Sequence, residues 1–123
     1  MISLRSASCF GAFLIVVQAS LSQVAGAAEY APLNCAKADA QAQKIICSDY
    51  GLGQQEARMA TLYALATSLV AMGQRGNIQD EQRAFLKERD ACGSNIDCIR
   101  NVYGSRIRQL NAVMADIIKR GPF

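Results

Sequence analysis

The distribution of cysteines constrains the fold of this chain more than any other sequence feature. The 123 residues contain five cysteines, and an odd number leaves one thiol unpaired in a disulfide protein. Cys9 stands alone near the N-terminus, whereas Cys35, Cys47, Cys92 and Cys98 lie further along the chain. The nature of the N-terminal segment therefore decides how the cysteines are interpreted.

Residues 1–27 have the layout of a cleaved secretory signal peptide. Arg5 is the only charged residue before Glu29, and the apolar run over residues 9–17 leads to small residues that end in Ala27 and Ala28. A positive start, a short apolar region and a small-residue cleavage site are typical of such signals. A transmembrane anchor is disfavoured, because the apolar run is well short of the roughly 20 residues that a spanning helix needs. A lipoprotein is disfavoured because the cysteine begins the run instead of following it.

We therefore predict cleavage after Ala27, or after Ala28, and a single mature domain over residues 28–123. The expected location is outside the cytoplasm, in an exported compartment or secreted, with no membrane span in the mature chain. Cys9 leaves with the signal, so four cysteines remain in an oxidising compartment. Disulfides there supplement the limited core of a small domain.

Four cysteines allow three pairings. We favour Cys35–Cys47, which flanks a short predicted helix, and Cys92–Cys98, which flanks the break between the last two predicted helices. The crossed pairings stay open, since spacing alone does not exclude them. A redox-active pair is disfavoured because no Cys-x-x-Cys motif is present. A four-thiolate zinc site is disfavoured outside a reducing compartment.

The hydrophobic periodicity of the mature chain predicts an all-α fold. Apolar residues recur at helical spacing over residues 59–70 and 96–117, and shorter stripes cover residues 78–86 and 38–46. No segment alternates apolar and polar residues in the manner of a strand. The expected architecture is a small bundle of about four helices, one short and three longer, stapled by two disulfides.

Polar and glycine residues predict where these helices begin and end. Residues 73–76 carry two glycines and predict a loop after the second helix, and Gly93 predicts a left-handed cap after the third. Asp97, three residues after Ser94, predicts a capping box for the last helix. The predicted N-caps are Asn34 or Asp39, Ser48 or Asp49, Asn77 and Ser94.

Composition and motifs argue against an enzyme. The chain has no histidine, which excludes Ser-His-Asp and Cys-His catalytic sites and the common zinc sites. No phosphate loop, nucleophile elbow or metal motif is present, so we expect no catalysis, no metal and no cofactor. Loss of Arg5 lowers the formal charge from +3 to +2, and no block of like charges predicts a nucleic-acid partner.

The cysteines and their surroundings resemble the LprI-type lysozyme-inhibitor family of small exported bacterial proteins. The family pattern Gln-x-x-Trp-Leu-x-x-Arg-Asp-x-Cys corresponds to residues 82–92, with Phe85 in place of Trp. The pattern Cys-Leu-x-x-x-Tyr-x-x-Arg-Ile-x-x-Leu corresponds to residues 98–110. The first half matches less specifically, with Gln43 where Glu is common and Gln55-Glu56 where Leu-Asp is usual. The similarity covers about residues 34–110.

Four charged residues near the apolar stripes are candidates for a buried network. Buried charges occur paired, so we interpret Glu56, Arg89, Asp90 and Arg106 as an internal structural network, with a binding role as the alternative. The two carboxylates are the expected partners of both arginines.

Other residues are weaker candidates for function. Tyr63 and Tyr103 fall on apolar stripes and are expected in the core with their hydroxyls at the rim. Residues 73–78 form an exposed candidate contact loop. The basic residues of the last helix are expected on a solvated face: Arg100, Arg108, Lys119 and Arg120.

The resemblance implies an inhibitor that is exported to the bacterial periplasm or secreted, binds a lysozyme and occludes its glycan cleft. One observation opposes this hypothesis, because C-type lysozymes are strongly basic and a partner at +2 gains no electrostatic steering. The alternative is a periplasmic interaction or stress-related module with the same fold and another partner. The sequence does not determine the oligomeric state.

Overall fold

The computed structural model describes residues 33–121, so the predicted signal peptide and its cleavage site lie outside the described residues. Within this range a 3-10 turn, η1 (Cys35–Lys37), is followed by four α-helices. These are α1 (Gln41–Ser48), α2 (Tyr50–Leu69), α3 (Met72–Ala91) and α4 (Ile96–Lys119). Residues 33–121 contain no strand. The prediction of an all-α fold with one short and three longer helices is confirmed.

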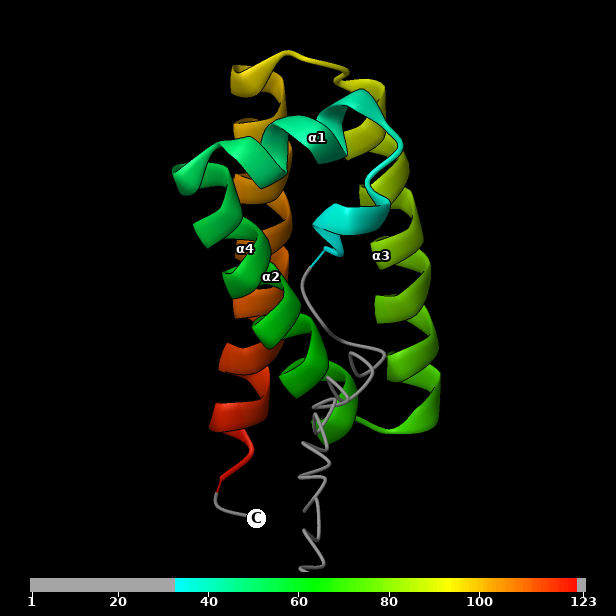
Figure 1. Cartoon of the computed structure of the whole chain (residues 1–123). Helices are drawn as coiled ribbons and strands as arrows, with labels where there is room; N and C mark the ends of the chain where they lie inside the picture. The colour runs from blue at the N-terminus through cyan, green and yellow to red at the C-terminus, as the bar shows by residue number, and fades with distance from the viewer. Residues whose placement is uncertain (1–32, 122–123) are drawn as a thin grey trace, which may run out of the picture.

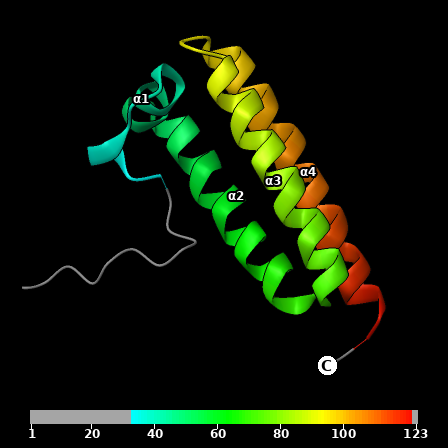
Figure 2. The ribbon, with the colours of Figure 1, turned by 90° about the vertical axis from the view of Figure 1, so that its right-hand side faces the viewer.

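The three long helices run along the length of the molecule, and α1 lies across one end of them (Figure 1). The view in Figure 2 shows α2 beside the pair formed by α3 and α4, with α1 at the same end as the α3–α4 turn. Between the long helices lies a core of buried apolar side chains. It includes Ile46, Leu52, Met59, Phe85, Ile99, Tyr103, Leu110 and Ile117. Among the described helices, none is long and apolar enough to span a membrane.

The two local disulfides are present as predicted. Cys35–Cys47 ties η1 to the last turn of α1, and Cys92–Cys98 ties the residue after α3 to the first turn of α4. Gly93 has φ 58°, the left-handed conformation that the sequence predicted after the third helix. Both disulfides therefore close short segments at the end of the bundle that carries α1.

Asp49 is the single residue between α1 and α2, and it caps the second helix. Its Oδ1 accepts a hydrogen bond from the Leu52 N–H at 2.8 Å. Asp49 is one of the two residues predicted to cap this helix, and it starts α2 at Tyr50 although the first turn contains Gly51 and Gly53. The cap of α4 is Asn95, whose Oδ1 accepts from the Cys98 N–H at 3.0 Å. The predicted capping box on Ser94 is therefore wrong by one residue.

The predicted loop over residues 73–76 is wrong, because α3 begins at Met72. Arg75 supplies the physical reason. Its Nε donates to the Thr67 carbonyl at 2.8 Å and its Nη2 to the Val70 carbonyl at 3.2 Å. These are backbone acceptors at the end of α2 that have no helical partner of their own. The first turn of α3 thus supplies hydrogen-bond donors to the free carbonyls at the end of α2. Asn77, which was predicted to cap the third helix, lies inside it.

Candidate functional site

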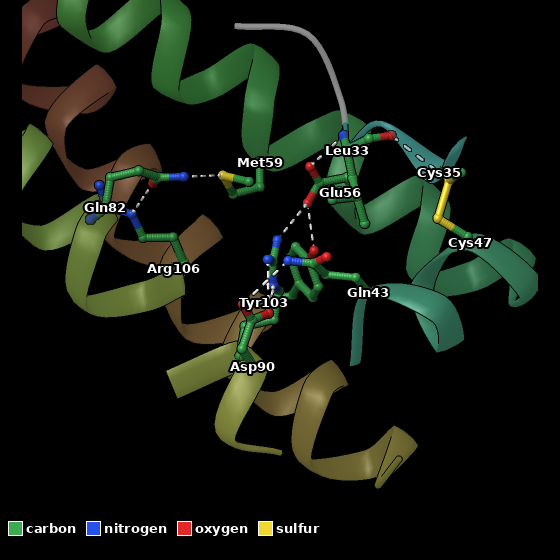
Figure 3. A network of polar contacts seen from close by, with 11 residues as sticks. Leu33, Cys35, Gln43, Cys47, Glu56, Met59, Gln82, Asp90, Tyr103 and Arg106 are labelled. Atoms are coloured by element: carbon green, nitrogen blue, oxygen red, sulfur yellow. Dashed lines mark hydrogen bonds and ion pairs between the residues drawn. A yellow bond between two sulfur atoms is a disulfide. The ribbon is translucent and has the colours of Figure 1, made fainter. Parts of the chain in front are cut away.

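A buried carboxylate, that of Glu56 on α2, is held by groups from three other segments (Figure 3). Its Oε1 accepts a hydrogen bond from the Leu33 N–H at 3.0 Å, and its Oε2 accepts one from the Tyr103 hydroxyl at 2.5 Å. Arg89 Nη1 lies 3.9 Å from the same Oε2. Only 7% of Glu56 is exposed, so these contacts replace the water that a carboxylate would otherwise bind.

Arg89 extends this network from α3 toward α1. Its Nη2 and Nε lie 2.8 and 2.9 Å from Asp90 Oδ1. The other oxygen, Asp90 Oδ2, accepts a hydrogen bond from the Gln43 side chain at 3.3 Å. Gln43 Oε1 in turn accepts one from the Asp39 N–H at 3.1 Å. The network therefore connects every helix of the bundle and the segment that precedes α1.

Tyr103 lies at the centre of the network and is fully buried. Burial raises the pKa of its phenol strongly, and the neighbouring Glu56 carboxylate raises it further. Its ring also packs edge-to-face on Phe85, with ring centroids 5.2 Å apart. The hydroxyl was predicted at the rim of the core, and the structure places it inside, as a neutral hydrogen-bond donor.

Arg106 was predicted to pair with Asp90 or Glu56, and the structure corrects this. Its guanidinium donates to the Ile78 carbonyl at 2.9 Å, to Gln82 Oε1 at 3.0 Å and to Glu81 Oε2 at 2.9 Å. The residue is 1% exposed. Arg106 thus joins α4 to α3 in a second cluster, separate from the Glu56 network (Figure 3). All four predicted charged residues have partners inside the protein, which favours structural roles over ligand binding.

The α1–α2 corner is a different kind of feature, because it faces solvent. We use this name for Asp49, Tyr50 and the adjoining pocket. The pocket has a volume of about 460 Å³, and its walls include Leu33, Ile46, Glu56 and the Cys35–Cys47 disulfide. Tyr50 stands at its edge with 84% of its surface exposed. Sequence reasoning missed this residue; its signal was a tyrosine placed directly after a helix cap and off every apolar stripe.

The remaining sequence candidates do not gather into a site. Residues 73–78 form the first turns of α3, and Ile78 is buried, so the predicted contact loop is wrong. Tyr63 is half-buried on α2. The four basic residues predicted on a solvated face, Arg100, Arg108, Lys119 and Arg120, are exposed. Arg100 and Lys119 pair with acidic residues one turn earlier on the same helix.

A family model described as "Lysozyme inhibitor LprI" matches residues 34–117. The chain belongs to the LprI family. The match begins at Asn34, which caps η1, and extends to Ile117 near the end of α4. It therefore includes both disulfides and, apart from Leu33, the Glu56 network and the α1–α2 corner of this LprI protein. No curated protein and no solved structure matches the chain.

Proposed function

We propose that this LprI-family protein is exported and inhibits a lysozyme by binding to it. The observation that carries the proposal is the family match over residues 34–117, which names a lysozyme inhibitor. The predicted signal peptide over residues 1–27 and the two disulfides fit an oxidising compartment outside the cytoplasm. The protein would act without catalysis or cofactor, by covering the glycan cleft of the enzyme.

The scaffold suits a binding protein. The helices are held by a buried network and two disulfides, so a surface residue next to them is already ordered before a partner arrives. Ordering a surface before association lowers the entropy cost of binding. An inhibitor that must compete with a glycan chain benefits from such a surface.

A second candidate function is an interaction with another envelope protein or component. The charge of the mature chain supports it, because a formal charge of +2 gives no long-range attraction to a basic lysozyme. The fold alone does not decide between the two, because one fold serves several partners.

The experiment is a lysis assay with purified residues 28–123 and lysozymes of different classes on a cell-wall suspension. We expect lysis to fall as the protein approaches molar equivalence with a susceptible enzyme, and the enzyme to recover when the two are separated. A sample that has been reduced and alkylated is the control. Full lysis at a large molar excess would exclude that lysozyme class, and capture from an envelope extract would then test the second candidate. The intact mass of the exported protein measures cleavage after Ala27 or Ala28.

A further inference from the structure

Tyr50 is the only aromatic residue among the strongly exposed large apolar side chains of residues 33–121. A side chain with 84% of its surface in water gains nothing from the core, so its position is not explained by folding. Tyrosine is among the residues that contribute most binding energy when they anchor an interface. The surface around Tyr50 therefore merits a functional explanation.

The backbone that carries Tyr50 is fixed from both sides. Asp49 caps α2 through the Leu52 N–H, which sets the direction in which the helix leaves the corner. Cys47, three residues before Tyr50, is tied to Cys35. Leu33 is tied to Glu56 of α2 on the far side of the pocket. The α1–α2 corner is therefore a pre-organised surface, and little conformational entropy is lost when a partner binds it.

The pocket beside Tyr50 is apolar in its walls and negative in its charge. Leu33, Ile46 and the Cys35–Cys47 disulfide supply the apolar walls. Two carboxylates, those of Asp49 and Glu56, line it, and no lysine or arginine is among its described lining residues. Glu56 is already engaged by Tyr103 and faces Arg89 at 3.9 Å, whereas Asp49 uses only Oδ1 for its cap. Asp49 is thus the carboxylate that a ligand can reach.

We infer that the α1–α2 corner is the surface that binds lysozyme, and that its pocket takes a lysine or arginine side chain of the enzyme. This inference rests on the proposed function. The alkyl stem of such a side chain fits apolar walls, its cationic end meets Asp49, and the ring of Tyr50 can cover it by a cation–π contact. The formal charge of +2 does not oppose this contact, because attraction to a basic enzyme depends on the local charge of the contact surface as well as on the net charge.

The test measures affinity for a basic C-type lysozyme, by calorimetry, and inhibition of lysis for four proteins: the unchanged domain, Tyr50→Ala, Asp49→Asn and Met72→Ala. Asparagine caps helices about as well as aspartate, so Asp49→Asn removes the charge and keeps the start of α2. Met72 is the matched control, because it is also exposed, at 83%, and begins α3, three residues beyond the end of α2 that is opposite Tyr50. Circular dichroism verifies that each variant is folded.

We expect Tyr50→Ala to weaken binding about 30-fold, the equivalent of an interface anchor, and Asp49→Asn about tenfold. Met72→Ala should bind within about twofold of the unchanged domain, the small change expected where no anchor is removed. If the occupant is a lysine, lysozyme with acetylated lysines should bind the unchanged domain less tightly, whereas Asp49→Asn should bind acetylated and unmodified lysozyme with equal affinity. If the occupant is an arginine, the unchanged domain should bind both forms of lysozyme equally and still more tightly than Asp49→Asn does. If the unchanged domain inhibits and Tyr50→Ala inhibits equally, the corner is not the interface and the proposed function stands. If the unchanged domain binds no lysozyme, the proposed function and the assigned occupant of the pocket both fall.

Discussion

The hydroxyl of Tyr103 on α4 donates a 2.5 Å hydrogen bond to the Glu56 carboxylate on α2, and both residues are buried. The bond joins two long helices through residues that are 47 positions apart in the sequence. Because a buried carboxylate needs donors to offset the loss of water, this contact is expected to contribute to stability.

Tyr103→Phe removes the hydroxyl and leaves the ring packed on Phe85. A hydrogen bond to a charged group is worth about 1.5–3 kcal/mol, so the free energy of unfolding should fall by about that amount. Urea denaturation followed by circular dichroism measures it. Tyr50→Phe is the matched control: its hydroxyl is on an exposed side chain, and the change should stay within about 0.5 kcal/mol. Equal effects of the two variants would contradict the structural role of the buried bond.

The raised pKa of Tyr103 predicts a loss of stability at alkaline pH. The unfolded chain loses the phenol proton near pH 10, whereas the folded protein retains it. Stability from this group is therefore complete below about pH 10 and falls by about 1.4 kcal/mol per pH unit above it. Urea denaturation across this range measures the slope, and Tyr103→Phe should flatten it. Ultraviolet titration that shows every tyrosine of the folded protein ionising near pH 10 would refute the prediction.

Arg106 and Glu81 form an asymmetric ion pair, because the arginine is 1% exposed and the carboxylate 55% exposed on their side chains. Arg106→Lys removes the planar group that reaches Gln82 and the Ile78 carbonyl together. The free energy of unfolding should therefore fall by at least about 2 kcal/mol. Glu81→Gln leaves an acceptor that water can also reach, and should cost less than about 1 kcal/mol. Thermal denaturation of both variants compares them. A larger cost for Glu81→Gln would mean that the ion pair, and not the buried guanidinium, stabilises this contact.

Removal of each disulfide should lower the free energy of unfolding by a different amount. Cys35–Cys47 closes a segment with a sequence separation of 12 and Cys92–Cys98 one of 6. When both cysteines of a pair are replaced by serine, the gain in entropy of the unfolded chain should lower the free energy of unfolding by about 3 kcal/mol for the first pair and about 2 kcal/mol for the second. Only the first replacement frees the backbone next to Tyr50, so it should also weaken lysozyme binding. Equal loss of binding in the two double variants would point to a general effect of unfolding.

Two glycine substitutions test the two ends of α3, Gly76→Ala its corrected start and Gly93→Ala the cap that follows it. A side chain at Gly76 meets nothing within 4 Å, and Gly76→Ala inside a helix should raise stability by about 0.5–1 kcal/mol. Gly93 has φ 58°, so Gly93→Ala should lower stability by about 1–2 kcal/mol even though the space is open. Urea denaturation distinguishes the two signs. No gain at Gly76 would favour the loop that the sequence predicted.

The sequence predicted the all-α fold and the family resemblance and favoured the two disulfides that are present, because each depends on local pattern. The apolar stripe over residues 96–117 predicts α4 almost to its ends, since helical periodicity is set by neighbouring residues. Cys92 and Cys98 were paired correctly because both flank one short break. The left-handed Gly93 follows from the same local logic.

The partners of the buried charges required the tertiary structure. Glu56 and Tyr103 were both noted in the sequence, yet nothing in it shows that the hydroxyl of one meets the carboxylate of the other. Arg106 binds Glu81, Gln82 and the Ile78 carbonyl, and not the expected carboxylates, because its position on α4 faces the middle of α3. The segment with Gly73 and Gly76 is helical because Arg75, within it, donates hydrogen bonds to backbone carbonyls at the end of α2. Which side chains pair between two helices depends on how the helices pack against each other. The periodicity of the sequence shows which residues share a face of one helix, but not which face of another helix they meet.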